Sequence, residues 1–504
     1  MLEIKDATYW AEQLKSGNLS AKALLEMTND KIQKLNPRYN AIVAYDLEKA
    51  KADLALTSQG FFAGLPFALK MLGQTHKGLP DTASSHLYNT ADTLIVGQTL
   101  GKDALASVGA TGSINFLIVG FAQGMTAGLT ILTAQRFGAK DELAIKKSYV
   151  TGLYFTIAIS ILLSILSLIF VGPLLQVMQT PSQIFEGAKT FLSIMLGGMI
   201  ATNLYAYLSN ALRALGDSKT PLYALIAASI LNIAFEYFAI LVLKLGIAGA
   251  SGATILAQMI SVLFLFWHIK RKVPEFQISK NLWRLDRAEI VHHARLGIPM
   301  GFQSSIIAIG SITLQVALNK MGTNAVATQA IVSKIDQFAM LPMISIGLAM
   351  ATFGAQNYGA KQYKRINQGL TWALTIAVGW SIIFAIILNL AHFYFTTAFI
   401  SSSQTAVIEM SSHYYLVNGS FYWLLAILFV TRSTIQGLGN AKIPTLCGFA
   451  ELFMRAGVAI IGVLLLNYTV IISSNPAAWL GSTSILIPTT IRMIKRFRQN
   501  QDLA

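Results

Sequence analysis

The side chains best suited to chemistry in this chain are carboxylates and amides inside long apolar runs. Asp92 lies within LYNTADTLIVG, and Asn232 and Glu236 lie within SILNIAFEYFAIL. Residues four apart share one face of a helix, and a carboxylate beside an amide carbonyl offers the oxygen ligands that hard cations prefer. Because a charged side chain in hydrocarbon is costly, an acid there is a functional candidate by default. The alternative for Asp92 is a solvated position near the membrane interface.

A second charged pair, Glu451 and Arg455, stands within GFAELFMRAG, again one helical turn apart. Opposite charges at this spacing neutralise each other inside a helical bundle. The pair is therefore interpreted first as a structural salt bridge and only second as part of a functional site.

Long membrane-spanning helices must position these residues. The chain is 54% hydrophobic and only 12% charged, whereas soluble domains average about 25% charged residues. A helix needs roughly 20 apolar residues to cross the hydrocarbon core. The spans predicted from the apolar runs are 112–134, 148–172, 188–211, 221–243, 248–269, 296–319, 328–353, 367–391, 411–436, 443–467 and 476–495, preceded by a shorter run at 87–100.

The chain carries an internal duplication. AQRFGAK at 134–140 returns as AQNYGAK at 355–361, and LGDSKTP at 215–221 returns as LGNAKIP at 438–444. Membrane proteins built from two repeats usually move one half against the other around a site between them. This pattern predicts a transporter, and Lys334 and Asp336 in the second half are expected to meet a partner across the halves.

The net charge of +15 is explained by topology. Alternate loops hold 22 Lys and Arg residues, while the opposite loops hold only Lys102, Lys189, Lys244 and Lys320. Such an excess marks the cytoplasmic side, so both termini are predicted to be cytoplasmic and no nucleic-acid partner is expected. The single cysteine, Cys447, excludes an intrachain disulfide, and no cleavable signal peptide is visible.

Residues 1–86 are polar and predict a small soluble α/β fragment. Helices are expected at 20–36 and 46–57, and strands at 41–45 and 66–72, with Ser20 as a helix N-cap. This fragment occupies the place where the first half of the first membrane helix is expected.

Two segments of this region, SAKALLEMTNDKIQKLNPRYNAIVAYD and GLPFALKMLGQTHKGLPDTASS, resemble the amidase signature family of Ser-Ser-Lys hydrolases. The resemblance implies that Lys70 corresponds to the catalytic lysine. The serine nucleophile, the bridging serine and the Gly/Ser-rich loop are missing, because the chain is already within the membrane where they are expected. A lone lysine cannot activate an absent nucleophile, so Lys70 is interpreted as a relic.

From about residue 87 onward the chain resembles the multidrug and toxic compound extrusion family. The matching segments include YNTADTLIVGQTLGKDALASVGATGS, TAQRFGAKDE, ALRALGDSKTP, GAQNYGA, IQGLGNAKIP and NPAAWLG. The resemblance implies an all-α membrane protein with two pseudo-symmetric lobes of six helices, the first helix truncated. The expected organisation is the amidase-like fragment at 1–86, the first lobe at 87–270 and the second lobe at 288–498.

The resemblance also implies a cation site in the first lobe. Asp92 matches the acid of the family's first helix, and Asn232 and Glu236 match an Asn-x-x-x-Asp motif in which Glu replaces Asp here. Thr254 matches a sixth-helix threonine. The alternative is simple hydrogen bonding between helices. No acid occurs at 296–319 or 411–431, so no cation site is expected in the second lobe.

The predicted function is export of drugs and organic cations across the bacterial cytoplasmic membrane in exchange for Na⁺ or H⁺. The expected partners are small-molecule xenobiotics and the lipid bilayer, with a monomeric chain and no cofactor beyond the coupling ion. The alternatives are amide hydrolysis by the N-terminal fragment, a flippase for lipid-linked substrates, and an inactive chimera of a transporter with an amidase remnant.

Overall fold

The computed structural model describes residues 101–502 apart from 179, 284, 285 and 401, and before them only 23, 26, 95, 96, 99 and 100. The chain divides into two compact units, Met1–Lys77 and Gly78–Ala504. Within the predicted amidase-like fragment only Ala23 and Glu26 are described, and both are helical. The predicted strands at 41–45 and 66–72, together with Lys70, lie outside the described residues, and so does Asp92.

The described part of the second unit is helical almost throughout, and it contains no strand. Its first half comprises α5 (Lys102–Gly138), α6 (Glu142–Val177), α7 (Ser182–Gly197), α8 (Met199–Ala214), α9 (Lys219–Tyr237), the π-helix η1 (Phe238–Val242) and α10 (Gly246–Lys272). The short 3₁₀ helices η2 (Pro274–Phe276) and η3 (Lys280–Trp283) follow. The remaining helices are α11 (Arg287–Asn319), α12 (Thr323–Gly359), α13 (Tyr363–Leu390), α14 (His392–Thr397), α15 (Thr405–Gly419), α16 (Tyr422–Gly437), α17 (Lys442–Leu464), α18 (Tyr468–Ile472) and α19 (Ser474–Asp502).

The predicted spans between 112 and 495 are confirmed as helices. Within the described residues, nine helices are long and apolar enough to cross a membrane, or eleven when each of two bent pairs is one span. The bent pairs are α7 with α8, at 46°, and α15 with α16, at 48°. The protein is therefore a multi-pass membrane protein.

The duplication is visible in the backbone itself. Positive φ angles occur at Gly101 and Gly322, at Lys140 and Lys361, and at Gly216 and Gly439. The first two pairs keep the register that aligns AQRFGAK with AQNYGAK, and the third keeps the register that aligns LGDSKTP with LGNAKIP. A left-handed residue is an uncommon conformation that ends or begins a helix at a fixed place. Its return in the register of the repeat shows that the two halves fold on one plan.

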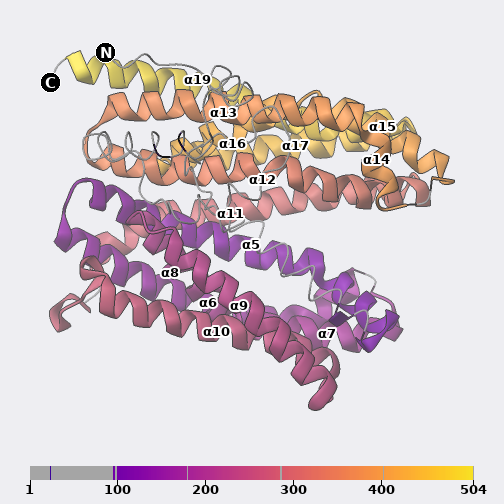
Figure 1. The fold of residues 1–504 in the computed structure, drawn as a ribbon, viewed down its shortest axis with the longest axis horizontal. Coiled ribbons are helices and arrows are strands. Elements are labelled where there is room, and N and C mark those ends of the chain that lie inside the picture. Colours follow the sequence, from indigo (N-terminus) through magenta and orange to yellow (C-terminus); the bar gives the residue numbers. More distant parts are fainter. Residues whose placement is uncertain are drawn as a thin grey trace. The chain divides into compact units, whose positions relative to one another are not determined.

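Each half of the duplication forms its own helical bundle around an apolar core (Figure 1). Helices α6 to α10 pack mainly on one another and on α5, and α12 to α19 pack mainly on one another, while α5 also packs extensively on α11 and α12. Helix α11 packs against both α5 and α17, so it links the two lobes. Large apolar side chains such as Ile169, Phe170 and Leu390 are exposed, because a membrane helix presents them to lipid rather than to water.

Candidate functional site

The predicted oxygen cluster of the first lobe is assembled in the structure. Asn232 and Glu236 lie on α9 and are completely buried, and Thr254 on α10 is 2% exposed. The amide nitrogen of Asn232 donates to the Thr254 hydroxyl over 3.1 Å. The contact joins the two helices one turn before Glu236.

The geometry of this cluster suits a small hard cation or a proton. The carbonyl oxygen of Asn232 is buried and accepts no hydrogen bond from the described residues. A buried unsatisfied acceptor is rare and points to a role beyond packing. Directly after Glu236 and Tyr237 the helix widens into the π-helix η1, and π-turns are frequent at functional sites. Amide, hydroxyl and carboxylate oxygens are together the ligand types that such an ion requires.

A polar track continues from this cluster along α10. Gln258 lies one turn beyond Thr254, and its side-chain oxygen accepts a hydrogen bond of 2.6 Å from Thr202 on α8. Neither Gln258 nor Thr202 was expected at the site. The sequence shows that Thr254 and Gln258 are one turn apart on one helix, but it does not show which neighbouring helix their side chains contact.

The described residues of the first span lie beside the same helices. Ile95 and Val96 are buried in one apolar cluster with Ile240 and Ala250. Ile240 belongs to η1 and Ala250 to α10, the segments that flank Glu236 and Thr254. The part of the first helix that is described therefore packs against the candidate site.

In the second lobe the predicted salt bridge between Glu451 and Arg455 is wrong, because Glu451 pairs with another arginine. Glu451 on α17 instead binds Arg432 on α16, with 3.1 Å between Oε1 and Nη1. The guanidinium of Arg455 extends toward α11, where its Nη1 lies 2.9 Å from the β-carbon position of Gly310. Spacing along one helix gave the wrong answer because a neighbouring helix supplies a better-placed cation.

Asp336 also has a different partner from the one expected. Its carboxylate accepts hydrogen bonds from the hydroxyls of Tyr414, at 2.6 Å, and Tyr422. Both tyrosines belong to the same lobe as Asp336, and no partner of Asp336 from the other lobe occurs among the residues that the structure describes. Lys334 is exposed. The sequence carried no signal for these contacts, since the tyrosines follow Asp336 by 78 and 86 residues.

The two lobes meet through a symmetric contact that we call the glutamine seam. It consists of Gln135 and Gly138 on α5 with Gln356 and Gly359 on α12. The amide of Gln135 donates to the Gly437 carbonyl over 2.9 Å, and the amide of Gln356 donates to the Ala214 carbonyl over 2.9 Å. These contacts map onto each other in the register of the sequence repeat, which pairs Gln135 with Gln356 and Ala214 with Gly437.

The seam leaves no room for side chains at its two glycines. A β-carbon at Gly138 would lie 1.8 Å from the Gln356 carbonyl oxygen, and one at Gly359 would lie 1.7 Å from that of Gln135. The seam sits at the ends of α5 and α12 that carry Arg136, Lys140 and Lys361. The lobes are thus closed on each other at the basic end of the bundle.

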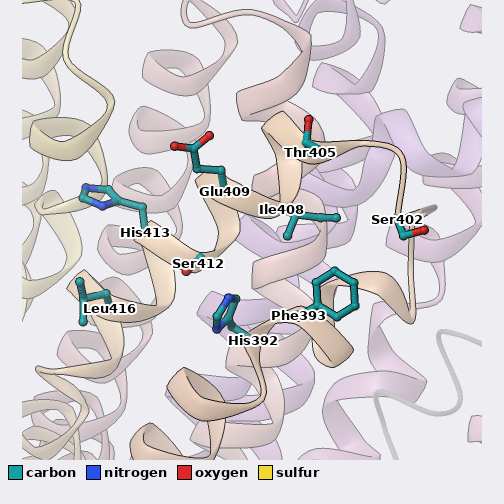
Figure 2. A pocket seen from close by; sticks show the side chains of 9 residues that line it. All are labelled: His392, Phe393, Ser402, Thr405, Ile408, Glu409, Ser412, His413 and Leu416. Carbon is teal, nitrogen blue, oxygen red and sulfur yellow. The ribbon is translucent and has the colours of Figure 1, made fainter.

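A separate pocket of about 510 Å³ opens between α14 and α15 (Figure 2). His392, Glu409 and His413 line it, but their side chains point in different directions, and His413 is hydrogen-bonded to Thr469 over 2.8 Å. No group of three or more His, Cys, Asp or Glu side chains able to hold a metal occurs among the described residues. The pocket offers no assembled ligand set.

Comparison with known proteins identifies related sequences. A profile of the MatE family matches residues 82–238 and 299–461. The probable multidrug resistance protein YoeA of Bacillus subtilis is 31% identical over 282 residues, which cover 55% of this chain and 61% of that protein. The probable multidrug resistance protein NorM of Thermotoga maritima is 24% identical over 423 residues, covering 81% of this chain and 87% of NorM. The match thus spans less than two thirds of YoeA and most of NorM.

Solved structures share the fold. A MOP superfamily transporter from Pyrococcus furiosus superposes with a TM-score of 0.76 at 22% identity, covering 83% of this chain and 94% of that one. A MATE structure in the bent conformation gives a TM-score of 0.77 at 21% identity over the same shares of the two chains. An outward-facing MATE family transporter gives 0.75 at 21% identity, covering 83% and 93%. At these identities the likeness concerns the fold.

Proposed function

Because the chain belongs to the MatE family, we propose that it exports drugs and organic cations across the bacterial cytoplasmic membrane in exchange for Na⁺ or H⁺. The observation that carries this proposal is the completely buried Glu236, one turn from Asn232, whose amide donates a hydrogen bond to Thr254. An acid kept inside a membrane lobe is retained for ion binding or proton transfer more often than for stability. The matched relatives YoeA and NorM, described as probable multidrug resistance proteins, support the substrate class.

Family members are transporters and use coupling ions rather than cofactors. Amide hydrolysis is therefore not proposed. The family match begins at residue 82, and a compact unit begins at Gly78. We place the transport unit from about residue 87 onward, with lobes at 87–270 and 288–498, and treat residues 1–86 as an addition with Lys70 as a relic.

We propose that coupling acts through the charge of the ion site in the first lobe. Each proton or sodium ion bound at Glu236 or at Asp92 changes the charge of the first lobe by one unit. A ligand shifts an equilibrium between two facing states by its difference in affinity for them. About 5.5 kcal/mol of difference reverses a 99:1 population.

The glutamine seam is weak enough to be opened in this way. A neutral hydrogen bond contributes about 1 kcal/mol, so the two glutamine contacts together lie well below that difference. The seam therefore suits a gate that closes the basic end in one state and separates in the other. The apolar contact of Ile131, Ala134 and Leu296 with Ala355 beside it adds to the closed state.

The basic end is proposed to face the cytoplasm, with both termini on that side and a monomeric chain in the membrane. With Cys447 replaced by Ser, a cysteine at Lys272 should stay unlabelled by an impermeant maleimide in intact cells. A cysteine at Lys320 should be labelled, because both side chains are exposed but lie in opposite loops. The reverse labelling pattern would invert the topology.

Efflux of ethidium from a pump-deficient host tests the function. The wild-type chain should lower cellular ethidium, and Glu236→Gln should abolish this at equal membrane abundance. Glu409→Gln is the matched control, because it removes the same charge from an exposed position. If Glu236→Gln exports like wild type, Glu236 has no part in coupling. If the wild-type chain exports nothing, the alternative of an inactive chimera holds.

A further inference from the structure

Asp336 occupies a position that the proposed function does not explain. It lies on α12 and is partly exposed, whereas the two tyrosines that donate to it are at most 1% exposed. Tyr414 donates to Oδ2 over 2.6 Å, and Tyr422 donates to Oδ1. Asn475 on α19 donates to the Tyr414 hydroxyl over 3.4 Å. Two phenol donors stabilise the ionised form of the carboxylate through charge-assisted hydrogen bonds, whereas its partial burial in the lobe opposes that form.

The two tyrosines stand on opposite sides of a break in one span. Tyr414 belongs to α15, Tyr422 belongs to α16, and the two helices meet at an angle of 48° around Ser420 and Phe421. One carboxylate on α12 therefore ties together both arms of the broken span. A change at Asp336 acts on both arms at once.

The charge state of Asp336 decides how firmly the arms are held. An ionised carboxylate accepts from both phenols, and such charge-assisted bonds are roughly twice as strong as neutral ones. A protonated carboxyl turns one oxygen into a donor. One phenol then loses its acceptor or must reorient, and the hold on that arm weakens.

The helices packed around Asp336 carry few charged side chains in their apolar stretches. The apolar stretches of α5, α11 and α13 present no charged side chain, since residues 104–135, 296–319 and 366–408 contain none. Lys334 on α12 itself is exposed. The other titratable or charged groups of these and adjoining helices include His392 and Tyr394 on α14, Glu409, His413 and Tyr415 on α15, Arg213 on α8, Arg432 on α16, Glu451 and Arg455 on α17, and Tyr468 on α18.

The charged side chains of α16 and α17 interact with each other rather than with Asp336. Glu451 pairs with Arg432, and Arg455 is close enough to Tyr414 to interact with it electrostatically. Among the described residues Asp336 forms no ion pair, so the two phenols are the groups that stabilise its negative charge. Protonation removes that charge and, with it, the charge-assisted part of both hydrogen bonds.

The first lobe shows that the bend itself does not require an acid. In the register that aligns AQRFGAK with AQNYGAK, Asp336 corresponds to Asn115 on α5. The equivalent span, α7 with α8, is bent by 46°. The carboxylate of the second lobe is thus an addition to a bend that the fold already makes, and what it adds is dependence on charge.

We propose that Asp336 is a second proton-binding site, whose ionised form holds the bend between α15 and α16 and whose protonation releases it. The role of this site in transport rests on the proposed exchange function, whereas the effect of protonation on the bend does not. It predicts that the second lobe senses protons through this bend, separately from the Glu236 cluster of the first lobe.

Distance measurements between spin labels test this inference on the purified protein without substrate. Labels at Ala406 on α15 and Trp372 on α13, in a Cys447→Ser background, occupy exposed positions. A bend change of about 10° moves the far end of a helix as long as α15 by about 4 Å. The wild-type distance should change by several ångströms as the pH falls from about 9 to about 5, and Asp336→Asn should hold the acidic distance at every pH.

Three tyrosine variants supply the controls. Tyr414→Phe and Tyr422→Phe each remove one donor to the carboxylate, and each should move the midpoint of the change upward by about one pH unit. Tyr415→Phe removes a buried hydroxyl from the same helix that makes no hydrogen bond to Asp336 among the described residues, and it should match wild type. These variants keep the test valid if Asp336→Asn does not fold.

The inference is overturned if Asp336→Asn retains the wild-type response, if Tyr415→Phe shifts the midpoint as Tyr422→Phe does, or if the distance responds to Na⁺ but not to pH. The test is independent of transport. A protein that passes it but exports no ethidium would remove the proposed function and leave this inference intact.

Discussion

The two lobes have the same backbone plan but place their charges differently. In the register that aligns LGDSKTP with LGNAKIP, Asn232 and Glu236 of α9 correspond to Arg455 and Ala459 of α17. Asp336 of α12 has an uncharged amide, Asn115 of α5, as its counterpart. The fold therefore does not dictate where an acid stands. Each lobe can hold a different site on one scaffold, the first a cluster of oxygen ligands and the second a carboxylate between two tyrosines.

The comparison also shows what the lobes share. The seam residues Gln135, Gly138, Gln356 and Gly359 are the same in both halves, and so are the left-handed positions that end their helices. In a symmetric contact between the lobes, equivalent residues of the two halves make equivalent contacts and therefore stay the same. Residues of a site inside one lobe have no such requirement. We therefore assign the identical residues to the proposed gate and the differing ones to the proposed ion sites.

Introducing the arginine of the second lobe at the equivalent position of the first lobe should have the largest effect on ethidium efflux. Asn232→Arg places a guanidinium one turn from Glu236. The resulting buried ion pair would keep the carboxylate ionised and prevent it from binding the coupling ion. We expect ethidium efflux to fall to background. The reciprocal change, Arg455→Asn, should leave ion-driven efflux measurable. If both variants export ethidium equally well, the ion site is not confined to the first lobe.

Side chains at the seam glycines should have the next largest effect. Gly138→Val or Gly359→Val cannot be accommodated at 1.8 or 1.7 Å from a carbonyl oxygen, so the lobes must separate at the basic end. We expect at least a tenfold loss of efflux, because overpacking costs about 1–3 kcal/mol or more. Labelling of a cysteine near the seam from the basic side should rise.

Gly379→Val is the matched control for the seam variants. Gly379 lies on α13, and no atom of another helix in the described part of the chain lies within 4 Å of the position that a β-carbon would take there. It should retain wild-type efflux and labelling. A seam variant that behaves like Gly379→Val would show that the closed contact is not part of the transport cycle.

The ion pair of the second lobe should contribute to stability rather than to coupling. Removing one partner of a buried pair typically costs about 3–5 kcal/mol. Arg432→Met should therefore lower the melting temperature of the purified protein, and the double variant Arg432→Met with Glu451→Leu should recover much of it. A double-mutant cycle should give Glu451 a larger coupling energy with Arg432 than with Arg455. Equal coupling would restore the pairing expected from spacing alone.

The smallest effect is expected from the glutamines. Gln135→Ala and Gln356→Ala each remove one hydrogen bond of 2.9 Å across the lobes. A loss of about 1 kcal/mol shifts a two-state equilibrium about fivefold. The two variants should raise cysteine labelling near the seam to the same extent, because the contacts are equivalent. Unequal effects would show that the gate is not symmetric.

Sequence patterns were sufficient for the helices and for part of the site. Apolar runs located the spans, and one-turn spacing brought Asn232 and Glu236 onto a shared face of α9. Spacing failed for Glu451, whose partner Arg432 lies on another helix. It also could not reveal the tyrosines of Asp336, because contacts between helices depend on packing angles that no periodicity within one helix records.

The central claim is that Glu236 couples an ion gradient to export, and purified protein in liposomes tests it most directly. An imposed Na⁺ or H⁺ gradient should drive ethidium across the membrane with wild-type protein. Glu236→Gln should bind ethidium but show no response to the gradient, while Glu409→Gln should respond as wild type does. Gradient-driven movement of ethidium by Glu236→Gln at the wild-type rate would contradict the account.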